Sequence, residues 1–140
     1  MIGTIRTLDV EMQDKLHADF QRIATNMGAA MDVEVDLQIT KGVPVTYNDP
    51  ELTAHILPML GKATDNINLV NSITGAEDFS FFANEVPSFF FFIGGCPEGT
   101  DPATAAPHHT PDFYVDDSGM ITGVKAMVNL TLGYMNNPMK

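Results

Sequence analysis

The stretch VEVDLQIT at residues 33–40 has the most regular pattern in the chain, and it indicates which kind of fold to expect. Apolar and polar residues alternate along it, which is typical of a strand with one face on a core and the other in water. Before it, four apolar residues recur at helical spacing after a capping Asp9, which predicts a helix over residues 9–28. They are Leu16, Phe20, Ile23 and Met27. With a short strand over residues 1–8, this region is predicted to form a strand–helix–strand unit.

The rest of the chain also alternates between helical and extended patterns. Asp49-Pro50-Glu51 combines a cap, a proline at the first helical position and an acid, which predicts a helix start. The apolar run FFFFI at residues 89–93 suits a strand buried on both faces, as in a parallel sheet covered by helices. Shorter strands are predicted at residues 67–73 and 113–115. A last helix over residues 116–135 carries an apolar face made of Ile121, Val124, Val128, Leu132 and Met135. The pattern predicts an α/β protein.

Composition excludes several classes of function. The 140 residues carry 18 acidic and 7 basic side chains, a net charge of −11, which disfavours nucleic acid and anionic membranes as partners. The single cysteine, Cys96, excludes an internal disulfide and a cysteine-based zinc finger. The longest apolar run is far shorter than the ~20 residues of a membrane helix. The N-terminus does not read as a secretory leader. A soluble protein is expected, with the cytoplasm favoured over the periplasm.

Two neighbouring histidines lie at the end of an irregular segment over residues 94–112. His108 and His109 could present a neutral imidazole to a metal, or they could belong to a solvated loop. The flanking prolines Pro107 and Pro111 favour an extended backbone, in which successive side chains point to opposite sides. We therefore expect only one of the two imidazoles to face a metal.

Two further candidates are a short acidic segment and an arginine. The segment GAEDF at residues 75–79 follows a weak strand, so Glu77 and Asp78 either cap a helix or line a ligand crevice at a strand end. Arg6 in the first predicted strand is either a solvated residue or an anchor for a carboxylate.

Four segments, in this order, resemble segments of bacterial metal-dependent amidohydrolases and metallopeptidases of the hippurate hydrolase, N-acyl-L-amino acid amidohydrolase and aminoacylase type. Each motif alone is weak, but their order and spacing over nearly the whole chain are specific. The segments are Gly3–Thr7 (family pattern GTxRT), Gly75–Phe79 (GxEDF), Val86–Gly94 (VPGxFFFxG, with Ser88 in place of the glycine) and His109–Phe113 (HSPxF).

The resemblance implies a C-terminal fragment of a two-domain enzyme. Residues 1–45 would be the last strand–helix–strand of a ferredoxin-like lid domain, through which such enzymes form homodimers. Residues 46–140 would be the C-terminal part of a zinc-peptidase-like catalytic α/β domain. The complete enzyme would hold two divalent ions, zinc or manganese. A metal-activated water would cleave the amide bond of an N-acyl amino acid such as hippurate, or of a peptide-like substrate.

The resemblance also assigns residues. His109 matches the last metal ligand of the family. Arg6 matches a lid arginine associated with the substrate's carboxylate, and Glu77 and Asp78 belong to a segment that lines the same cleft. The other metal ligands and the catalytic glutamate would come from segments before Gly3, so no catalytic residue is expected in this chain and the isolated chain is expected to be inactive.

Two alternatives remain open at this point. The chain could be a non-enzymatic binding or dimerisation module derived from the lid domain. It could also be an unrelated small α/β domain whose motifs match by chance.

Overall fold

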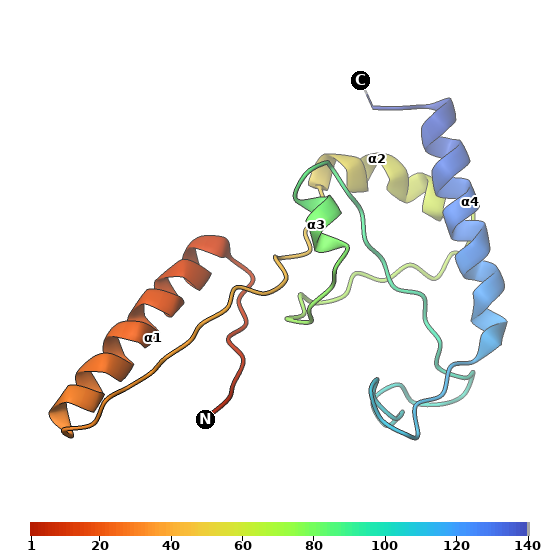
Figure 1. Ribbon diagram of the computed structural model, residues 1–140. Helices are drawn as coiled ribbons and strands as arrows, with labels where there is room; N and C mark the ends of the chain where they lie inside the picture. Colours follow the sequence, from red (N-terminus) through yellow and green to blue (C-terminus); the bar gives the residue numbers. More distant parts are fainter. Residues whose placement is uncertain (140) are drawn as a thin grey trace. The chain divides into compact units, whose positions relative to one another are not determined.

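The computed structural model describes residues 1–139, and contacts group the chain into two compact units (Figure 1). Unit 1 consists of Met1–Asn48 and Val70–Ser88. Unit 2 consists of Asp49–Leu69 and the chain from Phe89 onward. Each unit therefore combines two stretches that are separated in the sequence.

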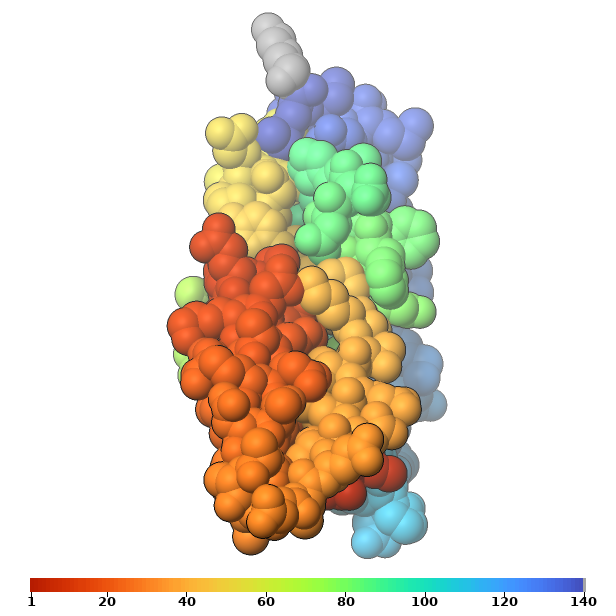
Figure 2. Space-filling view, turned by 60° about the vertical axis from the view of Figure 1, so that its left-hand side comes forward, coloured from red at the N-terminus to blue at the C-terminus, as the bar shows by residue number. Residues whose placement is uncertain are grey.

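Helix α1 (Val10–Ala30) is the main element of unit 1, and it begins where the sequence predicts. The Asp9 carboxylate accepts a hydrogen bond from the backbone N–H of Met12 at 2.6 Å, which satisfies one of the free donors at the helix start. At the other end the chain turns through Asp32, whose φ is 53°, and runs back beside the helix (Figure 1, Figure 2). An ion pair between Lys41 and Asp14 joins the returning segment to the helix.

Gly28 allows the returning segment to approach α1 closely. The backbone N–H of Val33 donates to the Gly28 carbonyl at 3.0 Å. A Cβ atom at Gly28 would lie 2.9 Å from the Val33 carbonyl oxygen and would also overlap the Val35 side chain. Any larger residue would therefore push the segment off the helix.

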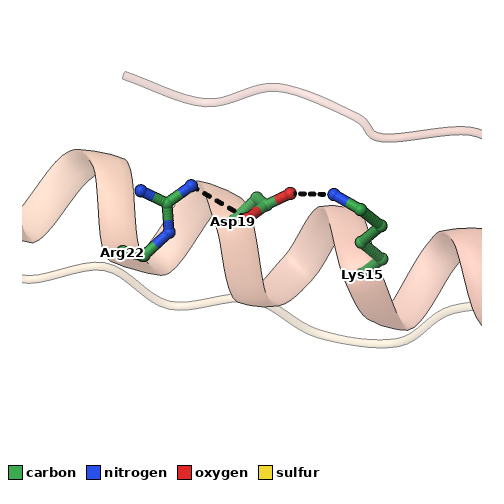
Figure 3. Close-up of polar contacts among 3 residues, drawn as sticks. All are labelled: Lys15, Asp19 and Arg22. Carbon is green, nitrogen blue, oxygen red and sulfur yellow. Dashed lines mark hydrogen bonds and ion pairs between the residues drawn. The ribbon is translucent and has the colours of Figure 1, made fainter.

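A three-residue charge network lies on the surface of α1 (Figure 3). Asp19 accepts a hydrogen bond from the Lys15 ammonium at 2.5 Å and one from the Arg22 guanidinium at 3.0 Å. These two cations, Lys15 first, lower the pKa of the Asp19 carboxyl group below its ordinary value. The network supports the helix through neighbours three and four residues apart.

The second stretch of unit 1 contains the short helix α3 (Ser80–Ala83). The Asn84 side-chain amide donates to the Ser80 carbonyl at 2.6 Å and to the Val45 carbonyl at 2.9 Å. This side chain thus ends the helix and ties it to the first stretch of the same unit.

Unit 2 is built on the packing of α2 (Pro50–Leu60) against α4 (Met120–Asn136). The predicted cap of α2 is confirmed, since the Asp49 carboxylate accepts from the Leu52 N–H at 2.8 Å. The 3-10 turn η1 (Asp117–Gly119) precedes α4, and the Asp116 carboxylate accepts from the Ser118 N–H at 2.9 Å. The residues buried between the two helices are Ile56, Met59, Leu60 and Ala126.

The face of α4 that packs on α2 differs from the one that the sequence predicts. Ala126 is 1% exposed and Gly133 lies against Met59, so the contact face is made of small residues. The predicted apolar face is exposed instead, with Val124 at 58% and Leu132 at 53%. Small residues form this contact because they let the backbones of α2 and α4 approach closely. The large apolar side chains of the predicted face remain about half exposed or more among residues 1–139.

None of the predicted strands forms in residues 1–139, so the α/β class is not realised within this part of the chain. Strands were predicted at residues 1–8, 33–40, 67–73, 89–93 and 113–115, and Figure 1 shows these segments as irregular chain. A strand is stable only when its backbone groups pair with a neighbouring strand. The nearest approach to such pairing is a single bond, from Asp116 N–H to the Gly95 carbonyl at 2.8 Å.

Much apolar surface is uncovered. The chain exposes 11294 Å², whereas two separate compact bodies, each of half its mass, would expose roughly 8,600 Å² in total. The predicted apolar face of α1 is part of this excess, with Phe20 47% and Met27 60% exposed. Such faces normally mark contacts with other protein segments. No helix among the described residues has the length and apolar character needed to cross a membrane.

Candidate functional site

Arg6 contacts the segment that carries the acidic candidates. Its Nη1 atom donates to the Thr74 carbonyl oxygen at 2.7 Å, joining residues that are 68 positions apart within unit 1. Thr74 directly precedes the Gly75–Phe79 segment, so two regions that the sequence singles out separately lie together. No carboxylate among residues 1–139 is within ion-pair distance of Arg6. The guanidinium is therefore held in place by a neutral oxygen, and its positive charge is not neutralised by an acidic side chain of the described residues.

Glu77 and Asp78 have different local roles. Glu77 Oε1 accepts from the Phe79 N–H at 3.2 Å in the turn before α3, but no side chain caps the helix itself. Asp78 is exposed, and its backbone carbonyl accepts from the Phe81 N–H at 3.1 Å. The Asp78 carboxylate has no hydrogen bond to another described residue. Of the two acids, Asp78 is the one whose side chain is free to meet a ligand.

His109 lies in unit 2, on a tight turn rather than on extended chain. Its φ is 64°, in the left-handed region that few residues other than glycine adopt. The Thr110 hydroxyl donates to the Pro107 carbonyl at 2.7 Å, and the Phe113 N–H donates to the Thr110 carbonyl at 3.1 Å. The expectation that flanking prolines keep His108 and His109 on opposite sides of an extended chain is wrong, because these hydrogen bonds bend the backbone between them.

The two histidine rings differ in their surroundings. The His108 ring lies edge-on to Phe113, with ring centroids 4.6 Å apart and an interplanar angle of 73°. The His109 ring lies 6.4 Å from the His108 ring and is exposed. His108 thus has the closer ring contact, and no phenylalanine or tyrosine ring contacts His109 among the described residues.

The described part of the chain does not assemble a metal site by itself. No group of three or more His, Cys, Asp or Glu side chains within residues 1–139 is placed to hold an ion. A catalytic zinc site uses three protein ligands, so His109 can supply one donor at most. No catalytic step through a metal can be built from these residues alone.

Two features of the site were not predicted from the sequence. One is the Thr74 carbonyl, a backbone acceptor that leaves no side-chain signal. The other is the contact between Phe113 and His108, for which the spacing of five residues across a proline-bounded loop was the available hint. Both depend on how the backbone bends between the partners.

Comparison with known proteins places these segments in a family. The chain is 26% identical over 137 residues to a Bacillus subtilis protein named as an amidohydrolase, YhaA, covering 96% of this chain and 34% of that protein. It is 28% identical to thermostable carboxypeptidase 2 of Saccharolobus solfataricus, covering 97% of this chain and 34% of the relative. The chain therefore spans about a third of the length of these curated relatives.

A solved structure shows the same relationship. The fold matches a crystal structure of a protein described as an aminohydrolase from methicillin-resistant Staphylococcus aureus, with a TM-score of 0.72 and 25% identity. The match covers 87% of this chain and 31% of that one. Residues 3–132 also match the sequence profile described as Peptidase family M20/M25/M40. Since this match covers nearly the whole chain, the chain belongs to Peptidase family M20/M25/M40.

Proposed function

We propose that this chain is the C-terminal third of a metal-dependent amidohydrolase that cleaves the amide bond of N-acyl amino acids or similar peptide-like substrates. In this proposal residues 1–45 belong to the lid domain and residues 46–140 to the catalytic α/β domain. Family membership supports the reaction class. The span of about a third of the relatives' length supports the view that other segments complete the enzyme.

The observation that carries the substrate proposal is the hydrogen bond between Arg6 and Thr74. The bond uses one of the five N–H donors of the guanidinium and leaves the others free. Arginine binds carboxylates through two parallel hydrogen bonds that it donates. An arginine without an acidic partner in its own chain can therefore bind a substrate carboxylate. We infer that Arg6 anchors the carboxylate of the amino-acid part of the substrate. Asp78, whose carboxylate is uncommitted, is proposed to line the same cleft together with Glu77.

His109 is proposed as one metal ligand of the complete enzyme. It is exposed and lies on irregular backbone, and both features suit a metal ligand whose site other segments complete. The bound ions, zinc or manganese, would supply Lewis-acid activation of water. No three described residues form a group that could hold an ion, so the remaining ligands are proposed to come from other segments of the enzyme.

The missing strand partners agree with the same proposal. The segments at residues 33–40 and 89–93 have strand patterns, yet neither forms a strand within residues 1–139, and α1 and α4 expose apolar faces. We propose that sheets from the rest of the enzyme pair with these segments and cover these helices. The α/β lid and catalytic domains would then form only in the complete protein.

A second candidate is a binding or dimerisation module without catalysis. The exposed apolar face of α1 favours it, because a homodimer contact through the lid region could use that face alone. The two candidates differ in one respect: only the enzyme needs Arg6 and His109.

A chimera tests the proposal. The last third of the Bacillus subtilis relative would be replaced by this chain, and hydrolysis of hippurate, other N-acyl amino acids and dipeptides would be measured with zinc or manganese. Arg6→Gln should raise KM for substrates with a free carboxylate but not for their amide-capped analogues. Arg22→Gln removes the same charge from an exposed helix and serves as the matched control.

Two results would oppose the proposal. A folded chimera that holds metal but hydrolyses none of these amides would reject the reaction class. An active chimera in which Arg6→Gln affects free and capped substrates equally would reject the carboxylate anchor. Chain association that survives in Arg6 and His109 variants, with no hydrolysis in any context, would favour the module.

A further inference from the structure

The turn from Pro107 to Phe113 holds one residue in an unfavourable conformation. His109 has a φ of 64°, which costs energy for any residue with a Cβ atom and persists only where the surroundings impose it. The turn therefore needs contacts that hold both of its sides. Three such contacts are present, and each of them spans or adjoins His109.

Two of the contacts are hydrogen bonds. The Thr110 hydroxyl donates to the Pro107 carbonyl at 2.7 Å and bridges the histidine pair. The Phe113 N–H donates to the Thr110 carbonyl at 3.1 Å and closes the following turn. These bonds bend the chain, but neither of them holds a histidine ring.

The third contact involves the rings. His108 and Phe113 meet edge to face with centroids 4.6 Å apart, within the range of favourable aromatic pairs. The contact connects the residue before His109 with a residue four positions after it, so it holds the two sides of the turn together. We call this contact between His108 and Phe113 the clamp. Phe113 is 42% exposed, which shows that core packing does not account for its placement.

We infer that Phe113 is a positioning residue: by holding His108 edge-on, it keeps the turn closed around His109 and leaves His109 as the imidazole available to a metal. This inference rests on the proposed role of His109 as a ligand. It assigns His108 a supporting role, as the side chain through which Phe113 acts. The aromatic ring is the feature that matters, so tyrosine should replace phenylalanine and leucine should not.

The clamp can be tested on the 140-residue chain itself by NMR. Ring currents from Phe113 should shift the His108 imidazole protons away from those of His109. The left-handed φ should give His109 a strong intraresidue NOE between the amide and Hα protons. Phe113→Leu should move the His108 signals to the position of a free histidine and weaken the His109 NOE, while Phe113→Tyr should preserve both.

A neighbouring aromatic provides the matched control. Tyr114 is 66% exposed, and no ring contact joins it to another described residue, so Tyr114→Leu should leave both NMR signatures unchanged. Far-UV circular dichroism of each variant reports whether α2 and α4 persist. The clamp is refuted if Phe113→Leu keeps both signatures, or if Tyr114→Leu changes them as strongly.

The second arm measures metal affinity in the complete enzyme by competition with a chelator. Phe113→Leu should weaken zinc binding by about 10–100-fold, the usual effect of removing a partner that orients a ligand. Phe113→Tyr should bind zinc like the parent. If His109→Ala binds zinc as tightly as the parent, the proposed function fails, whereas the NMR result stands by itself. If His109→Ala loses zinc but Phe113→Leu does not, only the positioning role of Phe113 fails.

Discussion

Gly133 and Gly123 allow the packing of α4 to be tested by the same substitution at two places. Both glycines lie in the same helix, but their surroundings differ. A Cβ atom at Gly133 would lie 2.6 Å from the Met59 sulfur, 2.9 Å from its Cγ and 3.2 Å from its Cβ. At Gly123 the nearest atom would be Ile93 Cγ1 at 3.4 Å, an ordinary contact distance.

The magnitudes follow from two opposing effects. Replacing glycine by alanine inside a helix stabilises it by about 0.8–1.0 kcal/mol. Overpacking a buried contact costs about 1–3 kcal/mol, and Met59 is buried, so its side chain has little room to move away. Gly123→Ala should therefore stabilise unit 2 by up to about 1 kcal/mol. Gly133→Ala should destabilise it by about 0–2 kcal/mol, since the clash outweighs the helix preference.

Urea unfolding followed by circular dichroism measures both free energies of unfolding. The two variants should differ by about 1–3 kcal/mol, with Gly133→Ala the less stable, and the dependence on urea should be the same for both. The double variant Gly133→Ala with Met59→Ala should lose the clash and separate it from the cost of the cavity. Equal stabilisation by both single substitutions would refute the packing of α4 on α2 through this face.

Three further predictions concern the isolated chain and the complete enzyme. The purified chain should not hydrolyse any N-acyl amino acid with added zinc or manganese, and turnover that a chelator abolishes would contradict the incomplete ligand set. Because Lys15 and Arg22 lower the pKa of Asp19, their ion pairs should stabilise α1 above the ordinary carboxyl pKa, and this stabilisation should be lost as the pH falls through the lowered pKa. A titration of the helix content by circular dichroism should show the loss, and Asp19→Asn should abolish this pH dependence. In the complete enzyme His109→Ala should lose metal and nearly all activity, while His108→Ala should weaken metal binding by about 10–100-fold; loss of metal in the His108 variant alone would move the ligand by one residue.

The helix starts were predictable because the interactions that define them are local. Asp9 caps the N–H of Met12 and Asp49 caps that of Leu52, each three residues away, so a short window of sequence contains both partners. The buried residues of α2, Ile56, Met59 and Leu60, also recur at helical spacing, which is a local property of the sequence. The same reasoning named an apolar face on α4, but it could not tell whether that face or the small-residue face would meet α2.

The site candidates were predictable as residue types but not as an arrangement. The sequence alone indicated Arg6, Glu77, Asp78 and His109 by their chemistry and by their order along the chain. It could not indicate that Arg6 meets the Thr74 carbonyl, because that contact closes a loop of 68 residues and involves a backbone atom. It also favoured an extended backbone at the histidines, where hydrogen bonds of the Thr110 hydroxyl and the Phe113 N–H impose a turn.

By itself, the sequence indicated the family resemblance, the starts of α1 and α2, the region of α4 and the chemistry of the candidate residues, because caps, helical periods and motifs are properties of neighbouring residues. Only the tertiary structure decided which helix faces pack, which guanidinium donor is occupied and how the turn at His109 is closed. Neither the sequence nor the structure of residues 1–139 yields the predicted strands, and the reason is physical. An alternating segment such as residues 33–40 provides one strand of a hydrogen-bonded pair, and the described residues contain no neighbouring strand to pair with it.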